Sequence, residues 1–260
     1  MPEADDLSLL ISAAREAGEI AKRFFRKDPQ VWDKGGDDGP VTEADFAVDS
    51  YLSESLTRAR PDYGWLSEET ADTPARLERT RCFIVDPIDG TRSFIHGDKN
   101  WAHSLAVVED GQPVAAVVYL PMRDRLFTAA KGKGAFLNDD PIKVGDHAQP
   151  DGARVLTARP NLAATHWIGT CPEFVHKFRP SLAYRLSLVA QGRYDAMISL
   201  RNTWEWDVAA GTLIVTEAGG TVTDRIGNAP EFNRPRPAID GMIAANPRLT
   251  REILDRLRPL

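Results

Sequence analysis

Residues 81–97 have the sequence RCFIVDPIDGTRSFIHG, and the rest of the chain is organised around this stretch. Residues 82–85, CFIV, are apolar and partly β-branched, which predicts a buried strand that the following proline and glycine bring to an end. Asp86 and Asp89 then lie three residues apart on a turn that the proline stiffens and the glycine bends. The two carboxylates are therefore expected to converge on one point beyond the strand.

Converging carboxylates repel each other, and a hard divalent cation such as Mg²⁺ relieves that repulsion. Such cations prefer oxygen ligands, including backbone carbonyls like that of Ile88 between the two acids. Gly90 and Thr91 are expected to open a helical turn, whose free N–H groups suit a phosphate. A solvated turn or a helix cap would explain an isolated DPxD motif equally well, so the interpretation depends on other segments of the chain.

Length and composition limit the number of domains and the kinds of partner that the protein could bind. A chain of 260 residues with 42% hydrophobic content can bury a sizeable core, as one large domain or two small ones. The formal net charge of −6 and the pI near 5.5, without a long basic stripe, argue against a general nucleic-acid or membrane surface. An acidic protein that binds a phosphate needs local positive charge, which metal ions held by clustered carboxylates would supply.

The cysteines and the first residues bear on the type of site and on the compartment. Cys82 and Cys171 lie far apart and in no CxxC spacing, so neither a zinc site nor a disulfide framework is expected. The opening residues, MPEADDLSLL, carry acids where a signal peptide has a basic region. No apolar run approaches the roughly 18 residues that a membrane span needs. These features predict a cytoplasmic protein.

Two helices and a polar loop are predicted before the acidic stretch. Residues 6–27 repeat apolar side chains at three- and four-residue steps, as in an amphipathic helix. Residues 33–40 are rich in glycine and aspartate and predict a loop over a site, mobile without metal, with Lys34 as its cation. Thr42 and Asp45 have the spacing of a capping box at the start of the second helix, and a cap alone would explain both side chains.

The segment that precedes the acidic stretch also ends in acids. Residues 63–67 predict a short strand that is followed by Glu68 and Glu69. Because adjacent strand residues point to opposite faces, only one of these glutamates is expected to face the other acids. Residues 71–80 are polar and predict a surface connection.

The remainder of the chain shows two patterns, which predict domains at residues 1–145 and 146–260. Apolar runs separated by turn residues predict an antiparallel meander at 101–109, 113–120, 125–130 and 134–137. With the two helices this meander indicates an α+β half. Alternating elements then indicate an α/β half. Its predicted strands are 154–158, 194–200, 220–224 and 239–245, and its predicted helices are near 171–178 and at 182–192, 207–218 and 247–258.

Three further segments, together with the acidic stretch, resemble one family. VTEAD at 41–45, LSEET at 66–70 and WEWDVAAG at 204–211 accompany DPIDGT in the order typical of the inositol monophosphatase superfamily. Its members are Mg²⁺-dependent, lithium-sensitive phosphomonoesterases, and they include 3′(2′),5′-bisphosphate nucleotidases. The resemblance covers most of the chain and implies a layered αβαβα fold with an active site shared between the two halves.

The resemblance also implies which residues act. The ligands of two to three Mg²⁺ ions would be four carboxylates and one carbonyl, those of Glu68, Asp86, Ile88, Asp89 and Asp207. Asp207 begins a helix, where the helix dipole alone would also explain an acid. Thr91, oriented by Asp45, would take a proton from a metal-activated water, while the amides of Gly90 and Thr91 hold the phosphate. Lys34 would lie beside the metals.

The sequence indicates the substrate less closely than it indicates the metal ligands. Inositol monophosphatases have an acid about seven residues before the metal-binding aspartate, where this chain has Leu200. A bisphosphate nucleotidase needs a cation for its second phosphate, which Arg185 or Arg201 could provide, and a histidinol-phosphate phosphatase is a further alternative. The expected ligand is a small phosphorylated metabolite, with no nucleic acid or membrane, and a homodimer is left open. The other class considered is a partner-binding regulatory protein, which would have no need to keep these acids together.

Overall fold

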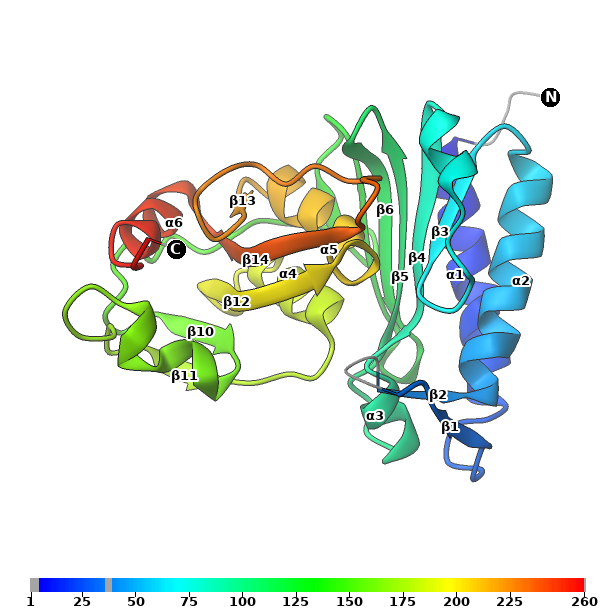
Figure 1. The fold of residues 1–260 in the computed structure, drawn as a ribbon, viewed down its shortest axis with the longest axis horizontal. Coiled ribbons are helices and arrows are strands. Elements are labelled where there is room, and N and C mark those ends of the chain that lie inside the picture. Colours follow the sequence, from blue (N-terminus) through cyan, green and yellow to red (C-terminus); the bar gives the residue numbers. More distant parts are fainter. Residues whose placement is uncertain (1–4, 36–38, 260) are drawn as a thin grey trace.

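The computed structural model describes residues 5–35 and 39–259, which form alternating layers of helix and sheet (Figure 1). Helices α1 (Asp6–Lys22) and α2 (Glu43–Ala59) lie side by side on one face of the first sheet. Helices α4 (Leu182–Ala190) and α5 (Glu205–Glu217) pack between the two sheets. Helix α6 (Pro247–Leu254) covers the far face of the second sheet. These layers confirm the predicted αβαβα fold.

The first sheet carries the acidic stretch. Its seven strands in the described chain lie in the order β3 (Gly64–Ser67), β4 (Arg81–Asp89), β5 (Ala102–Glu109), β6 (Gln112–Leu120), β7 (Arg125–Ala130), β8 (Ala135–Leu137) and β9 (Asp140–Ile142). The pairs from β4 to β9 are antiparallel, which confirms the meander predicted over β5 to β8 and extends it by β9. The antiparallel sheet expected for this half needs one correction at β3, which runs parallel to β4 because a connection through a 3₁₀-helix at Pro74–Glu78 separates them.

The second sheet belongs to the later part of the chain. Its strands lie in the order β11 (Val175–Lys177), β10 (Arg154–Thr157), β12 (Ala196–Trp204), β14 (Ala238–Ala245) and β13 (Thr221–Thr223). The helix predicted near 171–178 is wrong, since Val175–Lys177 is an edge strand parallel to β10. The open edge of β10 offers backbone partners to this short segment, whereas a helix of that length is unstable by itself.

The β4 strand runs beyond the point at which it was expected to end. It continues through Pro87, while its antiparallel partner β5 pairs Ser104 with Asp86 and Ala102 with Asp89. Two residues of β4 therefore oppose one residue of β5, which is a β-bulge. A bulge interrupts the ladder and so tolerates a proline that lacks an N–H group. The two aspartates thus belong to a bulged strand and not to a free turn.

The α5 helix is buried on nearly all sides. Its residues from Val208 to Val215 are buried, and they are apolar apart from Gly211 and Thr212. A helix that packs between two sheets needs apolar side chains all round. At Gly211, an added Cβ would lie 2.5 Å from Leu186 Cδ1 of α4, so the glycine allows the two helices to approach closely. This packing holds α5 against α4 between the two sheets.

The structure does not test two expectations, the mobility of the loop at 33–40 and the division into two domains. Strands β1 (Val31–Asp33) and β2 (Pro40–Thr42) pair on either side of the polar loop. Residues 36–38 of that loop lie outside the described residues, so the metal-dependent mobility expected of 33–40 stays a prediction. A division into domains at residues 145 and 146 falls between β9 and β10, and it also stays a prediction.

Candidate active site

Three carboxylates meet where the first sheet faces α5. Asp86 and Asp89 come from the bulged end of β4, and Asp207 stands in the first turn of α5. One carboxylate oxygen of each residue lies within 4.8 Å of the others. We call these three residues the acidic cluster. It joins side chains from both predicted halves of the chain.

The acidic cluster has the electrostatics of a cation site. Burial raises the pKa of Asp86 well above its ordinary value, and the charges of Glu68 and Asp89 raise it further. Burial likewise raises the pKa of Asp207, and the charge of Asp89 adds to the effect. The buried Oδ2 atom of Asp86 has no hydrogen-bond partner among the described residues. A set of oxygen donors with an unpartnered buried atom fits a hard divalent cation such as Mg²⁺.

Asp89 also connects β4 to the start of α4. Its Oδ2 atom accepts hydrogen bonds from Ser181 Oγ at 2.6 Å and from the backbone N–H of Ala183 at 2.7 Å. Burial raises the pKa of Asp89 to about 6, against the lowering effect of these hydrogen bonds. The sequence analysis did not single out Ser181, although a serine directly before a predicted helix is a recognisable N-cap. Its Oγ indeed accepts the N–H of Tyr184 at 3.0 Å.

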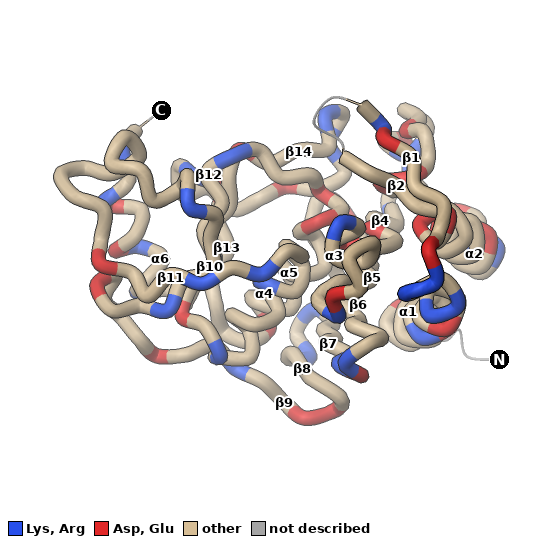
Figure 2. Tube along the Cα trace, turned by 90° about the horizontal axis from the view of Figure 1, so that it is seen from below, with Lys and Arg blue, Asp and Glu red and all other residues tan. Residues whose placement is uncertain are grey.

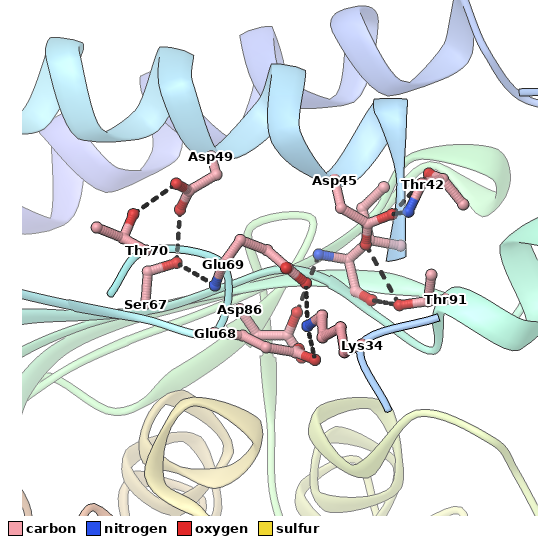
Figure 3. A network of polar contacts seen from close by, with 11 residues as sticks. Lys34, Thr42, Asp45, Asp49, Ser67, Glu68, Glu69, Thr70, Asp86 and Thr91 are labelled. Carbon is pink, nitrogen blue, oxygen red and sulfur yellow. Dashed lines mark hydrogen bonds and ion pairs between the residues drawn. The ribbon is translucent and has the colours of Figure 1, made fainter. Parts of the chain in front are cut away.

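Lys34 lies between two glutamates, near Asp86 of the acidic cluster (Figure 3). Its Nζ atom is 3.0 Å from Glu68 Oε1 and 2.7 Å from Glu69 Oε1. Burial works against the charged form of Lys34, but the two glutamates raise its pKa above the ordinary value. Burial raises the pKa of Glu69 to about 7. Because β3 ends at Ser67, strand alternation does not keep Glu68 and Glu69 apart, and both side chains contact the lysine. That only one of them faces the metals stays a prediction.

Asp45 joins the start of α2 to the start of α3 (Thr91–Ile95), as Figure 3 shows. Its Oδ2 atom accepts from the backbone N–H of Thr42 at 2.8 Å and from Thr42 Oγ1 at 2.6 Å. Its Oδ1 atom accepts from Thr91 Oγ1 at 3.3 Å. Burial raises the pKa of Asp45 to about 6, although the bonds from Thr42 lower it. The capping box and the contact with Thr91 are therefore both present.

The residues that follow Asp89 present donors at the edge of the acidic cluster. Gly90 has φ of 102°, a left-handed conformation that strains any other residue. As the first residues of a helical turn, Gly90 and Thr91 have N–H groups without an intrahelical acceptor. Thr91 Oγ1 also donates to the carbonyl of Ile88 at 3.1 Å, so this carbonyl lies next to the predicted catalytic hydroxyl.

His103 supports the bulge from the opposite strand. Its Nδ1 atom forms a short hydrogen bond with the carbonyl of Pro87. Because burial lowers the pKa of His103 to about 4, the ring is neutral at physiological pH, and the carbonyl partner requires the proton on Nδ1. The strand pairing that places His103 opposite the bulge cannot be read from the residue type, so no sequence pattern indicated this contact.

Arg185 lies beside the acidic cluster, and no carboxylate among the described residues bonds directly to its guanidinium. The residue is only 6% exposed, and its guanidinium lies 4.5 Å from the ring centroid of Phe178. Its hydrogen bonds within the described chain go to the main-chain carbonyls of Arg179 and Pro180. Burial lowers its pKa to about 10, an effect that the nearby charge of Asp89 opposes.

The other candidate, Arg201, lies on β12 next to Leu200, the position at which inositol monophosphatases have an acid. Arg201 is exposed, and its charge lowers the pKa of Asp207 against the larger effect of burial. Leu200 is 9% exposed and packs in a core cluster with Val155 and Ile198. Position 200 therefore offers no polar group to a substrate, whereas both arginines add positive charge near the acidic cluster.

Figure 2, which views the molecule from the end at which α3 lies, shows charged residues of both signs interspersed along the described chain. Among the helices of the described residues, none has the length and apolar character to span a membrane.

The sequence matches a model of the "Inositol monophosphatase family" over residues 4–259. "Inositol monophosphatase 3" of Solanum lycopersicum is 36% identical over 243 residues, covering 89% of this chain and 90% of the relative. "Nus factor SuhB" of Pasteurella multocida is 32% identical, with 97% and 96% covered. The solved structure of "extragenic suppressor protein suhB" from Bartonella henselae aligns with a TM-score of 0.84 at 31% identity, covering 97% of this chain and 98% of that one. The chain therefore belongs to the inositol monophosphatase family, whose members are metal-dependent phosphomonoesterases.

Proposed function

We propose that the protein hydrolyses a small phosphomonoester with two to three Mg²⁺ ions. The proposed ligands are the acidic cluster, Glu68 and the carbonyl of Ile88. The observation that carries the proposal is the convergence of Asp86, Asp89 and Asp207 within 4.8 Å, with one buried carboxylate oxygen unpartnered in the described chain. Mg²⁺ bound there would supply charge that lowers the pKa of a water molecule and stabilises the leaving oxygen.

The chain itself would position the nucleophile and receive its proton. Thr91 Oγ1 has its hydrogen directed at Asp45 or at the Ile88 carbonyl, which leaves a lone pair for an attacking water. Asp45, with its pKa raised to about 6, is ionised at neutral pH and accepts the proton through the Thr91 hydroxyl. The backbone N–H groups of Gly90 and Thr91 would donate to the phosphate oxygens. Lys34 would hold Glu68 and Glu69 through its two ion pairs.

For the substrate, the family and its relatives named inositol monophosphatase support an inositol phosphate. Leu200 removes the acid that would contact ring hydroxyls, so selectivity for the inositol ring would be reduced. A second candidate is a compound with two phosphates, such as 3′-phosphoadenosine 5′-phosphate. It is supported by Arg185 and Arg201, which both place positive charge near the acidic cluster. Histidinol phosphate remains a third candidate.

Phosphate release tests these candidates directly. Purified protein with Mg²⁺ would be assayed on inositol 1-phosphate, 3′-phosphoadenosine 5′-phosphate and histidinol phosphate, with a chelator as the control. We expect metal-dependent release that millimolar Li⁺ inhibits. Arg185→Met and Arg201→Met are expected to raise KM for the bisphosphate more than for the monophosphates. Two results would contradict the proposed function. One is phosphate release that persists in chelator, and the other is a protein that releases phosphate from none of the three compounds in the presence of Mg²⁺.

A further inference from the structure

A second polar cluster, built around the buried side chains of Arg76 and Glu205, lies on the other side of the first turn of α5. It comprises Asp72, Arg76, Glu205, Asn233 and Arg234, and we call it the Arg76 cluster. We propose that Arg76 is a positioning residue, which acts through the loop at 233–234 and through Glu205 to hold Asp207 in place. This inference rests on the proposed function, because it assigns Asp207 to the metal site.

Arg76 lies in the 3₁₀-helix Pro74–Glu78, within a segment that the sequence predicted to be a surface connection. Its side chain is nevertheless only 1% exposed. The guanidinium donates two hydrogen bonds to Asp72, from Nε to Oδ1 at 2.7 Å and from Nη2 to Oδ2 at 2.9 Å. It also donates to Asn233 Oδ1 at 2.7 Å and to the carbonyl of Arg234 at 2.8 Å. One arginine next to the first sheet therefore fixes a loop from the later part of the chain.

The same loop holds the first residue of α5. The backbone N–H groups of Asn233 and Arg234 donate to Glu205 Oε2 at 2.6 Å and Glu205 Oε1 at 3.1 Å. The Glu205 N–H in turn donates to the carbonyl of Pro237 at 2.9 Å. Asn233 has φ of 59°, so the loop adopts a left-handed conformation that its surroundings must maintain. Arg76 therefore reaches Glu205 through hydrogen bonds at every step.

Glu205 and Asp207 share the first turn of α5, and a shift of one moves the other. Ser104 Oγ of β5 donates to the carbonyl of Trp206 at 2.9 Å, between the two acids. The first sheet thus holds this turn at one point directly and at a second point through Arg76. A metal site needs its ligands within about 0.5 Å of their working positions. Loss of the Arg76 contacts should therefore weaken metal binding without removing a ligand.

The test compares Arg76→Met with Arg81→Met. The methionine keeps most of the apolar stem of Arg76 and removes all its donors. Arg81, whose side chain is 37% exposed, is the control for loss of an ion-paired arginine, because its ion pairs join Asp6 and Glu109 and do not involve α5. Calorimetric titration of Mg²⁺ into each metal-free protein, below its unfolding temperature, gives the metal affinity without any assay of activity. We expect Arg76→Met to raise the dissociation constant about 10–100-fold, as for other residues that orient metal ligands.

Turnover supplies the second readout. At saturating Mg²⁺, kcat of Arg76→Met is expected to return close to the wild-type value, since no reacting group has changed. Equal Mg²⁺ affinity in folded Arg76→Met and in wild type would overturn the inference while leaving the proposed function intact. A wild-type protein that binds no Mg²⁺ would overturn both.

Asn233→Gly provides a milder variant in case Arg76→Met does not fold. Glycine keeps the left-handed backbone and the N–H bond to Glu205, but it loses the acceptor for Arg76. We expect its Mg²⁺ dissociation constant to rise roughly 2–10-fold, the range for a single hydrogen bond. An unchanged constant in this variant would also count against the positioning role.

Discussion

The acidic cluster and the Arg76 cluster both lie at the first turn of α5, yet they differ in how their charges are satisfied. Asp72 and Glu205 are paired with a guanidinium and with backbone N–H groups. In contrast, Asp86 has a buried oxygen without a hydrogen-bond partner in the described chain, and Asp89 and Asp207 add like charges beside it. Buried charge is costly unless it is paired. The unpaired cluster is therefore the one that requires a cation from outside the protein.

The largest expected effect comes from removing one acid of each cluster in turn. Asp89→Asn should abolish turnover, yet leave the metal-free protein as stable as wild type or more so. The reason is that burial raises the pKa of Asp89, so its charge opposes folding, and the amide can still accept from Ser181. Asp72→Asn should lower stability, because the hydrogen bond with Arg76 lowers the pKa of Asp72 and its charge therefore favours folding.

Thermal melts of both variants in chelator check this contrast, with phosphate release measured in Mg²⁺. A large loss of stability in Asp89→Asn would show that Asp89 serves mainly to cap α4. The assignment of the acidic cluster as a metal site would then be wrong.

Two aspartates of α2 that each accept a hydrogen bond from a threonine elsewhere in the chain give the next comparison. Thr91 Oγ1 donates to Asp45, and Thr70 Oγ1 donates to Asp49 at 2.6 Å (Figure 3). Thr91 also bonds the carbonyl of Ile88, which precedes Asp89 of the acidic cluster. Thr91→Ala should lower kcat by roughly 10²–10⁴-fold, as expected for a positioned proton acceptor. Its dependence on Mg²⁺ concentration should stay near that of wild type. Thr70→Ala should change kcat little.

Steady-state rates over a range of Mg²⁺ concentrations decide the role of Thr91. If Thr91→Ala recovers the full rate once Mg²⁺ is raised far enough, its hydroxyl contributes to metal binding. The proton transfer to Asp45 would then have to be abandoned.

The smallest effect concerns the pH dependence of stability through His103. Burial lowers the pKa of His103 to about 4 in the folded protein, from an ordinary value of 6.5. Between these values the unfolded chain binds more protons, so the free energy of unfolding should fall as pH drops from about 6.5 to about 4. His103→Asn keeps an N–H donor for the Pro87 carbonyl but does not titrate. Relative to wild type, it should lose this part of the pH dependence.

Denaturant unfolding at several pH values measures the free energy of unfolding of wild type and of His103→Asn. The difference between the two cancels the contributions of other titrating groups. His96→Asn, at an exposed position, is the control. Parallel pH profiles for wild type and His103→Asn would show that the buried ring is not a source of acid sensitivity.

Local patterns predicted most helices and strands because periodicity reflects which face is buried. The apolar steps of residues 6–27 gave α1, although the helix ends at Lys22, and the capping box at Thr42 starts α2 as expected. Pairing between distant segments carries no such local signal. The parallel course of β3 and the edge strand at Val175–Lys177 depend on neighbours that only the folded chain supplies.

The same distinction holds at the site. Asp86 and Asp89 could be predicted to converge because they are close in sequence, and Asp207 joined them only through the family resemblance. In the sequence, Arg76 is one charge in a polar connection. Its side chain contacts a loop whose Asn233 lies 157 residues later, and no local pattern indicates that contact. His103 faces the bulge only because of the strand register.

Calorimetric titration of Mg²⁺ into the metal-free protein tests the central claim most directly, with wild type and Asp207→Asn compared under the same conditions. Asp207 is the proposed ligand from the later part of the chain, so its loss should weaken the site without unfolding either sheet. We predict saturable binding in wild type and an affinity at least about 10-fold lower in Asp207→Asn. Wild-type protein without saturable binding, or an affinity that Asp207→Asn leaves unchanged, would contradict a metal site at the acidic cluster.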